Sequence, residues 1–316
     1  MNILIIGGTR FQGRYLVDQL ISHGHKVTVF HRGNHPANFP VEVEVIHGDR
    51  NIREDLQKLQ TKSFDWLVDT CAYVPSQCDL VLKTLGHQIH KLCFVSSSYV
   101  YTSTYPRISE IAELKKPEYR DEKISAASYG PLKVACEERY SSEIGQENVL
   151  ILRPSVLIGP GDHTMRLQFW IEALAGPKLY TLVDPNRKIQ LLDVRDYTNF
   201  FASALERNLT GVFNLAGHPE PLTDIVEFIQ SKKMDEKLQR RTIDWELFEH
   251  NSISRSEIPY ALPIEGEDYC SEKAKTLGFN HRPIHETLAD CLGASTNNSV
   301  GGEMSELLRR FQKIMS

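Results

Sequence analysis

A tyrosine and a lysine lie four positions apart in the segment Tyr129-Gly-Pro-Leu-Lys133. Residues at positions i and i+4 share one face of a helix, so the phenol and the ammonium are neighbours if this segment is helical. Pro131 fits a helix only in its first turn, which places the helix start near Tyr129. An ammonium close to a phenol lowers the pKa of the phenol, so such a tyrosine can act as an acid or a base. The spacing predicts proton-transfer chemistry, although a Y-x-x-x-K match alone is common by chance.

A run of serines ends the apolar stretch Leu92–Ser96, which we expect to be a buried strand. A serine at the carboxyl end of a parallel strand faces the crevice in which ligands bind. Its hydroxyl can polarise a substrate carbonyl. The serine run and the tyrosine–lysine pair together therefore predict chemistry on an alcohol or a carbonyl.

A glycine-rich turn follows the first apolar run, Asn2–Ile6, and opens a helical pattern over 10–23. Glycines in such a turn let the backbone approach a pyrophosphate, and the helix N-terminus offers free N–H groups to the anion. Arg10 replaces the middle glycine of the usual spacing, so we expect it beside the adenosine half of a dinucleotide. The predicted contacts of this turn are Gly7, Gly8, Thr9, Arg10, Phe11, Gln12 and Gly13.

The second predicted strand, Lys26–Phe30, continues into His31-Arg32-Gly33 without the acidic residue that usually accepts the ribose 2′-hydroxyl of NAD. A guanidinium binds phosphate in a bidentate manner, so Arg32, together with Arg10, favours NADP, with NAD as the alternative cofactor. His31 is a further predicted cofactor contact. Asp49 and Arg50 follow the third predicted strand and are placed to reach the adenine, but a turn aspartate is an equal interpretation of Asp49.

The elements that must position these residues alternate between short apolar strands and helical patterns. This rhythm predicts an α/β fold, a Rossmann doubly wound parallel sheet of about seven strands, with a smaller C-terminal substrate-binding region. The predicted strands are Asn2–Ile6, Lys26–Phe30, an edge strand over 41–45, Trp66–Asp69, Leu92–Ser96, Val149–Leu152 and Gly211–Leu215. The predicted helices span 52–60, 76–86, 129–143, 165–175 and 196–207.

The predicted division of the chain follows from the same rhythm. We expect a dinucleotide-binding domain over 1–165, with 192–217 returning to its sheet, and a substrate-binding region over 166–191 and 218–292. A small polar linker over 293–302 precedes an amphipathic helix over 303–316. That helix docks on its own domain or forms a contact between two copies, so a homodimer is possible.

Composition excludes several classes of protein. The 316 residues carry a net charge of −5, which leaves no broad basic field for nucleic acid, so nucleic acid is not a favoured partner. No apolar run is long enough to span a membrane, and we expect no membrane partner. The six cysteines form no C-x-x-C pair, so we expect no metal site and reduced thiols in the cytoplasm. The basic residues Lys232, Lys233, Lys237, Arg240 and Arg241 are more typical of a solvated helix face than of an RNA site.

With these motifs in this order, the chain resembles the extended short-chain dehydrogenase/reductases of the NAD-dependent epimerase/dehydratase family over about residues 1–290. The family serine lies four residues before the tyrosine of a V-Y pair, here Tyr101, and matches Ser97. Tyr129 and Lys133 match the family tyrosine and lysine. The resemblance implies that Tyr129 exchanges a proton with the substrate oxygen, that Ser97 hydrogen-bonds the same oxygen, and that Lys133 holds the nicotinamide ribose. The segments 152–154, 159–162 and 193–196 also resemble family stretches.

The resemblance leaves more than one function open. The leading interpretation is an NAD(P)-dependent oxidoreductase acting on a small-molecule substrate, and the alternative is a nucleotide-sugar epimerase with tightly bound NAD. A sugar dehydratase is disfavoured because its T-D-E carboxylates are absent from Ser97-Ser98-Tyr99. The GGTRF turn resembles a subgroup that includes chloroplast stem-loop-binding proteins, which keeps a non-catalytic cofactor-sensing or RNA-binding protein as a third hypothesis.

The substrate itself is not identified by the sequence. We expect residues 70–75, 99–125, 155–190 and 255–270 to line or cover the crevice. Flat contacts to the substrate can come from aromatic side chains in these ranges, although core packing explains aromatic residues equally well. The aromatic candidates are Tyr73, Tyr99, Trp170 and Tyr180.

Overall fold

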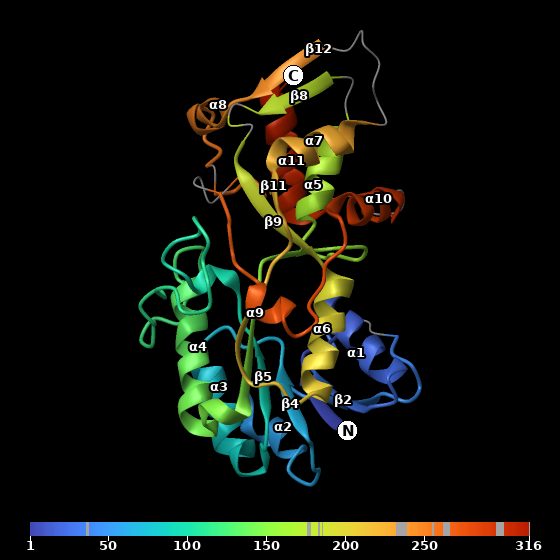
Figure 1. Ribbon diagram of the computed structural model, residues 1–316, viewed down its shortest axis with the longest axis vertical. Helices are drawn as coiled ribbons and strands as arrows, with labels where there is room; N and C mark the ends of the chain where they lie inside the picture. The colour runs from blue at the N-terminus through green and yellow to red at the C-terminus, as the bar shows by residue number, and fades with distance from the viewer. Residues whose placement is uncertain are drawn as a thin grey trace.

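The structure is a computed structural model that describes residues 1–35, 38–175, 178–182, 184, 186–231, 239–254, 256–261, 266–294 and 300–315. Two bodies follow one another along the long axis, a lower one around a large sheet and an upper one built mainly of helices (Figure 1). Among these described residues, no helix combines the length and apolar character that crossing a membrane requires.

Seven parallel strands form the large sheet in the order β10-β6-β5-β4-β1-β2-β3. Strand order reverses between β1 and β4, which is the switch point where open α/β sheets bind ligands. The predicted doubly wound sheet is therefore confirmed. Its strands are β1 (Asn2–Ile6), β2 (Lys26–His31), β3 (Glu44–His47), β4 (Trp66–Asp69), β5 (Leu92–Val95), β6 (Val149–Pro154) and β10 (Gly211–Leu215).

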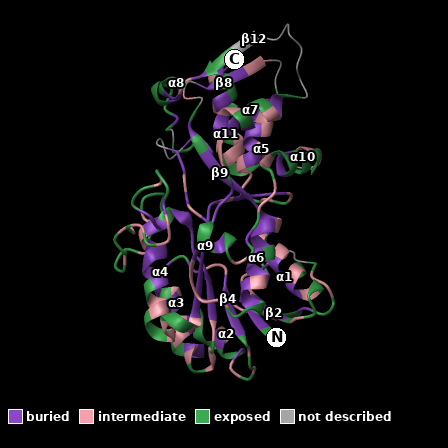
Figure 2. Cartoon of the chain, viewed as in Figure 1, coloured by how far each residue is buried: buried purple, intermediate pink, exposed green. Residues whose placement is uncertain are grey.

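Alternating side chains of β1 bury both faces of the sheet. Ile3 and Ile5 enter the core shared with α1 (Phe11–Ser22) and α6 (Val194–Glu206). Leu4 and Ile6 enter the core on the opposite face, which is covered by the helices α2 (Arg53–Gln57), α3 (Pro75–Leu85) and α4 (Tyr129–Ile144). Figure 2 shows the strands as a buried layer between these helices. Burial of each such side chain stabilises the fold by about 1.5–3 kcal/mol.

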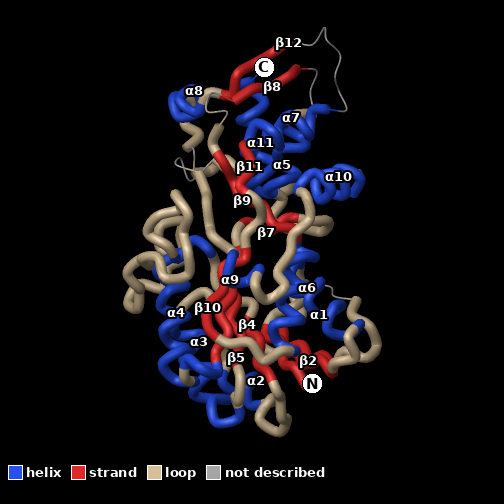
Figure 3. The backbone as a smooth tube through the Cα atoms, viewed as in Figure 1, coloured by secondary structure: helices blue, strands red, loops and turns tan. Residues whose placement is uncertain are grey.

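The upper body has its own core and two small sheets, in the orders β11-β9-β7 and β12-β8 (Figure 3). Its strands are β7 (Val156–Ile158), β8 (Lys178–Leu182), β9 (Lys188–Asp193), β11 (Pro219–Pro221) and β12 (Gln239–Ile243). Its helices are α5 (Arg166–Ala173), α7 (Leu222–Gln230), α8 (Trp245–His250), α10 (Ile284–Ala294) and α11 (Gly302–Met315). The remaining short helices are η1 (Gly86–Gln88), η2 (Ser98–Val100), η3 (Gln146–Asn148) and α9 (Glu272–Lys275).

The amphipathic helix at the end of the chain docks on its own domain. Phe311 of α11 stacks on Phe248 of α8, with ring centroids 4.7 Å apart, and also packs against Trp170 of α5. The structure therefore shows the first of the two interpretations of this helix. Residues 295–299 of the expected linker lie outside the described residues.

The expected edge strand over 41–45 is displaced. Strand β3 begins at Glu44, while the Val43 N–H closes a turn onto the Pro40 carbonyl at 3.0 Å. Val41 is 95% exposed. The alternation of valine and glutamate imitates a strand, but the turn prevents residues 41–43 from joining the ladder with β2.

Candidate active site

The turn after β1 requires glycine at three positions. Gly7 and Gly8 have φ values of 101° and 78°, in the left-handed region. A Cβ atom at Gly7 would lie 2.4 Å from Thr70 Oγ1, and one at Gly13 would lie 2.6 Å from the Gly8 Cα. The first turn of α1 therefore packs backbone to backbone on the glycine turn, which brings its free N–H groups to the switch point of the sheet.

A crevice of about 300 Å³ opens over this turn. Gln12 presents a side-chain oxygen in its wall that is buried and has no hydrogen-bond partner among the described residues. The predicted cofactor residues that line the crevice are Gly7, Gly8, Thr9, Arg10, Gln12, Gly13, His31, Arg32, Asp49 and Arg50.

Phe11 differs from the prediction for the turn. Its side chain is buried and does not line the crevice. The ring packs edge-on against Tyr15 at 6.3 Å and against His163 at 6.4 Å between centroids. The first helical residue directs its side chain into the core beneath α6, so Phe11 anchors the turn instead of facing the crevice.

Basic side chains gather where β2 ends. Arg10, Arg32 and His35 line the crevice there. Burial lowers the pKa of His163, and the charge of Arg10 lowers it further. Burial lowers the pKa of His31, and its neighbour His47 acts in the same direction. This end of the crevice therefore carries positive charge.

Asp49 contributes the one carboxylate among the described residues that line the crevice. One of its oxygens accepts the Asn51 N–H at 2.9 Å and the Asn51 side-chain amide at 2.7 Å. This geometry is that of an Asx turn. The turn interpretation of Asp49 therefore has direct structural support.

Arg50 forms part of the crevice floor, but its guanidinium is engaged elsewhere. It donates to both carboxylate oxygens of Asp69, at 2.6 and 2.8 Å, and both side chains are buried. The Tyr140 hydroxyl donates to the same carboxylate at 2.5 Å. Burial opposes ionisation of Asp69, but Arg50 holds the pKa of this carboxyl below its usual value. Arg50 therefore fixes β4 to the loop after β3.

The structure brings Ser97 and Tyr129 together. Ser97 lies close enough to Tyr129 to lower the pKa of its phenol, although burial is the largest influence and raises that pKa above the ordinary value of 10.0. The Ser97 hydroxyl also accepts the Tyr99 N–H at 3.2 Å, which caps η2. The helix that begins at Tyr129 and the strand end before Ser97 thus place two hydroxyls at one point.

Lys133 lies one turn further along α4 and is 2% exposed. Its ammonium donates to the carbonyls of Ala72 and Val95, both at 2.8 Å, and lies 5.1 Å from the centre of the Tyr73 ring. It is not among the charges that shift the pKa of Tyr129. The expected lowering of the Tyr129 pKa by Lys133 is therefore not seen, because the ammonium is turned to the strand ends.

Two exposed tyrosines flank Tyr129. The rings of Tyr73 and Tyr99 each lie 6.4 Å from the Tyr129 ring, and their exposed fractions are 41% and 38%. Trp170 and Tyr180, the other two aromatic candidates, are buried in the core of the upper body. The structure thus separates two crevice aromatics from two core aromatics, a distinction that residue type cannot make.

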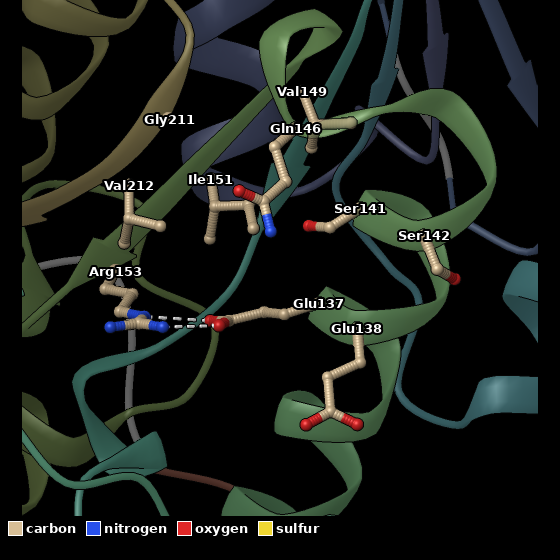
Figure 4. Close-up of a pocket in the computed structure, with 10 residues that line it drawn as sticks. All are labelled: Glu137, Glu138, Ser141, Ser142, Gln146, Val149, Ile151, Arg153, Gly211 and Val212. Carbon is tan, nitrogen blue, oxygen red and sulfur yellow. Dashed lines mark hydrogen bonds and ion pairs between the residues drawn. The ribbon is translucent and has the colours of Figure 1, made fainter. Parts of the chain in front are cut away.

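Behind the hydroxyl pair lies a buried ion pair that the sequence did not single out for a role. Arg153 donates to both carboxylate oxygens of Glu137, with 2.9 and 2.5 Å separations. Ser96 also donates its hydroxyl to Glu137. Figure 4 shows the pair in a hollow of about 440 Å³ between α4 and the strands β6 and β10. The available signal was spacing, since Glu137 follows Lys133 by one helical turn.

A second buried carboxylate faces the tyrosines from the upper body. Glu267 is 2% exposed and accepts the Gln190 N–H at 2.8 Å. Burial raises the pKa of Glu267 to about 7, and the charges of Arg187 and Arg166 partly oppose that shift. The negative charge of Glu267 in turn raises the pKa of Tyr99. Nothing in the local sequence of Glu267 indicated its burial.

Comparison with known proteins shows which family and which solved structures this chain resembles. Residues 3–78 match the model of the NAD dependent epimerase/dehydratase family. The structure superimposes on UDP-glucuronic acid 4-epimerase from Bacillus cereus in complex with NAD, with a TM-score of 0.70, 18% identity and coverage of 94% and 99% of the two chains. It superimposes equally on dTDP-glucose 4,6-dehydratase from Bacillus anthracis in complex with NAD, with a TM-score of 0.70, 18% identity and coverage of 94% and 97%.

A curated relative is the chloroplast stem-loop binding protein of 41 kDa b from Arabidopsis thaliana, 25% identical over 234 residues. The match spans 68% of this chain and 58% of that protein. The family model confirms the predicted resemblance to the NAD-dependent epimerase/dehydratase family over residues 3–78, and the solved structures show the same fold over most of the chain. That family is one of enzymes, in agreement with the predicted class of protein.

Proposed function

We propose that this chain is an NAD(P)-dependent enzyme that transfers hydride to or from a carbonyl or hydroxyl carbon of a small polar substrate. The observation that carries the proposal is that Ser97 lies beside Tyr129, whose ring is 6.4 Å from that of Tyr73 in the wall of the glycine-built crevice. Family membership alone would not support catalysis, because a Rossmann fold also serves proteins without activity.

The residues of the crevice fit a dinucleotide. The glycine turn leaves room for a pyrophosphate where any Cβ would collide with Thr70 or with the Gly8 backbone. The unpaired Gln12 oxygen accepts a hydroxyl or amide proton from the ligand. When bound, the cofactor supplies or takes the hydride at its nicotinamide ring.

We propose NADP as the preferred form, with NAD as the alternative. Support comes from the positive charge at the end of β2, where Arg10, Arg32 and His35 line the crevice. The one lining carboxylate, Asp49, is held in its own turn by Asn51. A 2′-phosphate would gain bidentate contacts from the guanidinium groups, whereas a 2′-hydroxyl would find no free carboxylate. Several structural neighbours are complexes with NAD, which supports NAD binding by this fold but does not support a preference for NADP.

The protein side of the reaction follows from the hydroxyl pair. Tyr129 is protonated at neutral pH, because the ordinary pKa of a phenol is 10.0 and burial raises it further, so its proton is available to a carbonyl oxygen. Ser97 hydrogen-bonds the same oxygen and lowers the pKa of Tyr129. Lys133 fixes the strand ends by its two carbonyl contacts, and we assign the ribose contact to it by family resemblance.

We place the substrate beside Tyr73, which lines the crevice, Tyr99 and the buried Glu267. The two exposed rings offer faces for the C–H surface of a cyclic polyol, while Glu267 and the nearby arginine charges favour a polar ligand over a steroid-like one. This favours a sugar-like substrate, in line with the structural neighbours that are named as nucleotide-sugar epimerases and dehydratases. An epimerase with tightly bound NAD is therefore the second candidate function.

The name of the curated relative favours RNA binding as a candidate of another class. Most of the basic patch that would support it, residues 232–238, lies outside the described residues. Titration of a labelled RNA stem-loop by gel shift at physiological salt would test it directly.

A cytoplasmic location and a homodimer stay predictions.

The proposal is tested by titrating the purified protein with NADPH and NADH, following the heat of binding. Tight binding of NADPH over NADH supports an NADP-dependent reductase and justifies a screen of carbonyl substrates. NAD that copurifies with the protein favours the epimerase. Binding of neither nucleotide overturns the proposal.

A further inference from the structure

Two histidines and one glutamate meet on the surface where two helices end. The Glu206 Oε1 lies 2.7 Å from His23 Nδ1 and 2.8 Å from His25 Nε2. All three ligand atoms lie within 4.8 Å of one another. His23 and His25 follow α1, and Glu206 is the last residue of α6, and Figure 1 shows these two helices side by side.

The backbone fixes these side chains in place. Gly24, with φ of 77°, ends α1, and the His25 N–H donates to the Leu20 carbonyl at 3.0 Å. The end of α6 has the same geometry: Asn208 has a φ of 54°, and the Leu209 N–H donates to the Ala204 carbonyl at 2.9 Å. Both are Schellman-type helix ends. The three ligands therefore stand on rigid supports.

The electrostatics of this corner favour a cation. The helices α1 and α6 both present their C-termini here, and each C-terminus carries a partial negative charge. The carboxylate of Glu206 adds a full charge. One cation at this point would interact favourably with all three.

The ligand set and its surroundings match the preferences of zinc. Two imidazole nitrogens and one carboxylate oxygen are typical zinc ligands, with a water in the fourth position. The exposed fractions of His23, His25 and Glu206 are 36%, 12% and 33%, so solvent reaches the site. The side-chain amide of Gln19 lies 2.8 Å from the second ring nitrogen of His23, and the Met1 ammonium lies 3.3 Å from Nδ1 of His25. The Gln19 amide oxygen can accept the N–H of a metal-bound His23, whereas the Met1 ammonium is itself a donor and must leave Nδ1 when His25 binds a cation.

We propose that His23, His25 and Glu206 form a binding site for Zn²⁺ or a similar first-row divalent cation. Tetrahedral coordination at ~2.0 Å separates neighbouring ligand atoms by roughly 3.3 Å, so the Glu206 oxygen, which lies 2.7 and 2.8 Å from the two ring nitrogens, moves away from them when a cation enters. The site lies at the amino ends of β2 and β10, whereas the crevice lies at the carboxyl ends of the strands. The cation therefore joins α1 to α6 and stabilises the fold without touching the reacting groups.

The test uses the full chain after removal of metal with a chelator. Zn²⁺ is titrated in competition with a chromophoric indicator, and the unfolding midpoint is measured with and without Zn²⁺. With free zinc at 100 times its Kd, the expected rise in Tm is about 4 °C for a chain of this length. Co²⁺ in place of Zn²⁺ should give the visible absorption bands of a four-coordinate site.

The variants His23→Gln and Glu206→Gln each remove one ligand from a partly exposed position and should weaken zinc binding at least about tenfold. At the same free zinc concentration, the Tm rise should fall from about 4 °C to about 2 °C or less. The matched control is His90→Gln, which changes an exposed histidine outside the cluster and should bind one equivalent like the wild type. Binding below one equivalent in the wild type, or equal binding in all variants, would overturn the proposal. Because NADPH binding is measured separately, the outcome does not depend on the proposed enzyme activity.

Discussion

Glu137→Gln should be the most destabilising conservative change in α4. The substitution keeps the shape of the side chain but leaves the Arg153 guanidinium buried without its counter-charge. The exposed fractions of the two side chains are 3% for Arg153 and 5% for Glu137, so water from the neighbouring hollow compensates only a small part of the lost charge. Breaking a buried pair of this kind costs about 3–5 kcal/mol.

The unfolding entropy converts this free energy into a temperature. At about 2.1 cal/mol/K per residue, 316 residues give about 0.66 kcal/mol/K, so Tm should fall by about 5–8 °C. Differential scanning calorimetry or thermal circular dichroism measures the shift. The neighbouring change Glu138→Gln removes an exposed carboxylate and should lower Tm by less than about 1 °C.

A double variant separates lost charge from lost packing. Glu137→Gln combined with Arg153→Met removes the unpaired guanidinium and should recover part of the stability lost in the single variant. The reasoning fails if Glu137→Gln lowers Tm no more than Glu138→Gln. It also fails if the double variant is less stable than Glu137→Gln by the full cost of a second, independent substitution.

Three further predictions concern the crevice. Arg32→Ala should weaken NADPH binding at least about tenfold, the scale of one charge-assisted contact, and leave NADH nearly unchanged, as measured by calorimetry; equal losses would remove the argument for NADP. Gly13→Ala places a Cβ 2.6 Å from the Gly8 Cα, so it should destabilise the protein by about 1–3 kcal/mol in denaturant unfolding and impair binding of both nucleotides. The phenol of Tyr129, whose pKa is raised, is protonated at neutral pH, so initial rates of reduction should be flat between about pH 6 and 8. The rate of oxidation should rise as the pH approaches the pKa of Tyr129. An oxidation rate that is constant in this neutral range would contradict the assignment.

The sheet was predictable because its signals are local and repeated. Buried parallel strands read as short apolar runs, and β10 has the predicted bounds Gly211–Leu215. Helix α4 begins at Tyr129 as Pro131 requires. The strand predicted at residues 41–43 is wrong because alternation reflects side-chain chemistry, whereas a turn at Pro40 decides whether the backbone reaches β2.

The site was predictable in its positions but not in its contacts. The family resemblance identified Ser97 and Tyr129 as partners, yet no local pattern shows that Asp69 holds Arg50 or that Phe11 faces the core. Lys133 turns toward two strand-end carbonyls, which depends on how α4 packs on β4 and β5. Glu206 lies 181 residues from His25, so sequence spacing does not reveal their meeting. In each case the missing information is a partner distant in sequence.

The central claim is that Tyr129 is the proton donor of a hydride-transfer enzyme. The most direct measurement compares Tyr129→Phe with the wild type on the carbonyl substrate found by screening, following NADPH oxidation by absorbance and nucleotide binding by calorimetry in the same preparations. We predict that kcat falls by about 10²-fold or more, the usual contribution of a general acid, while NADPH affinity stays within about twofold. Turnover at the wild-type rate in Tyr129→Phe would contradict the account.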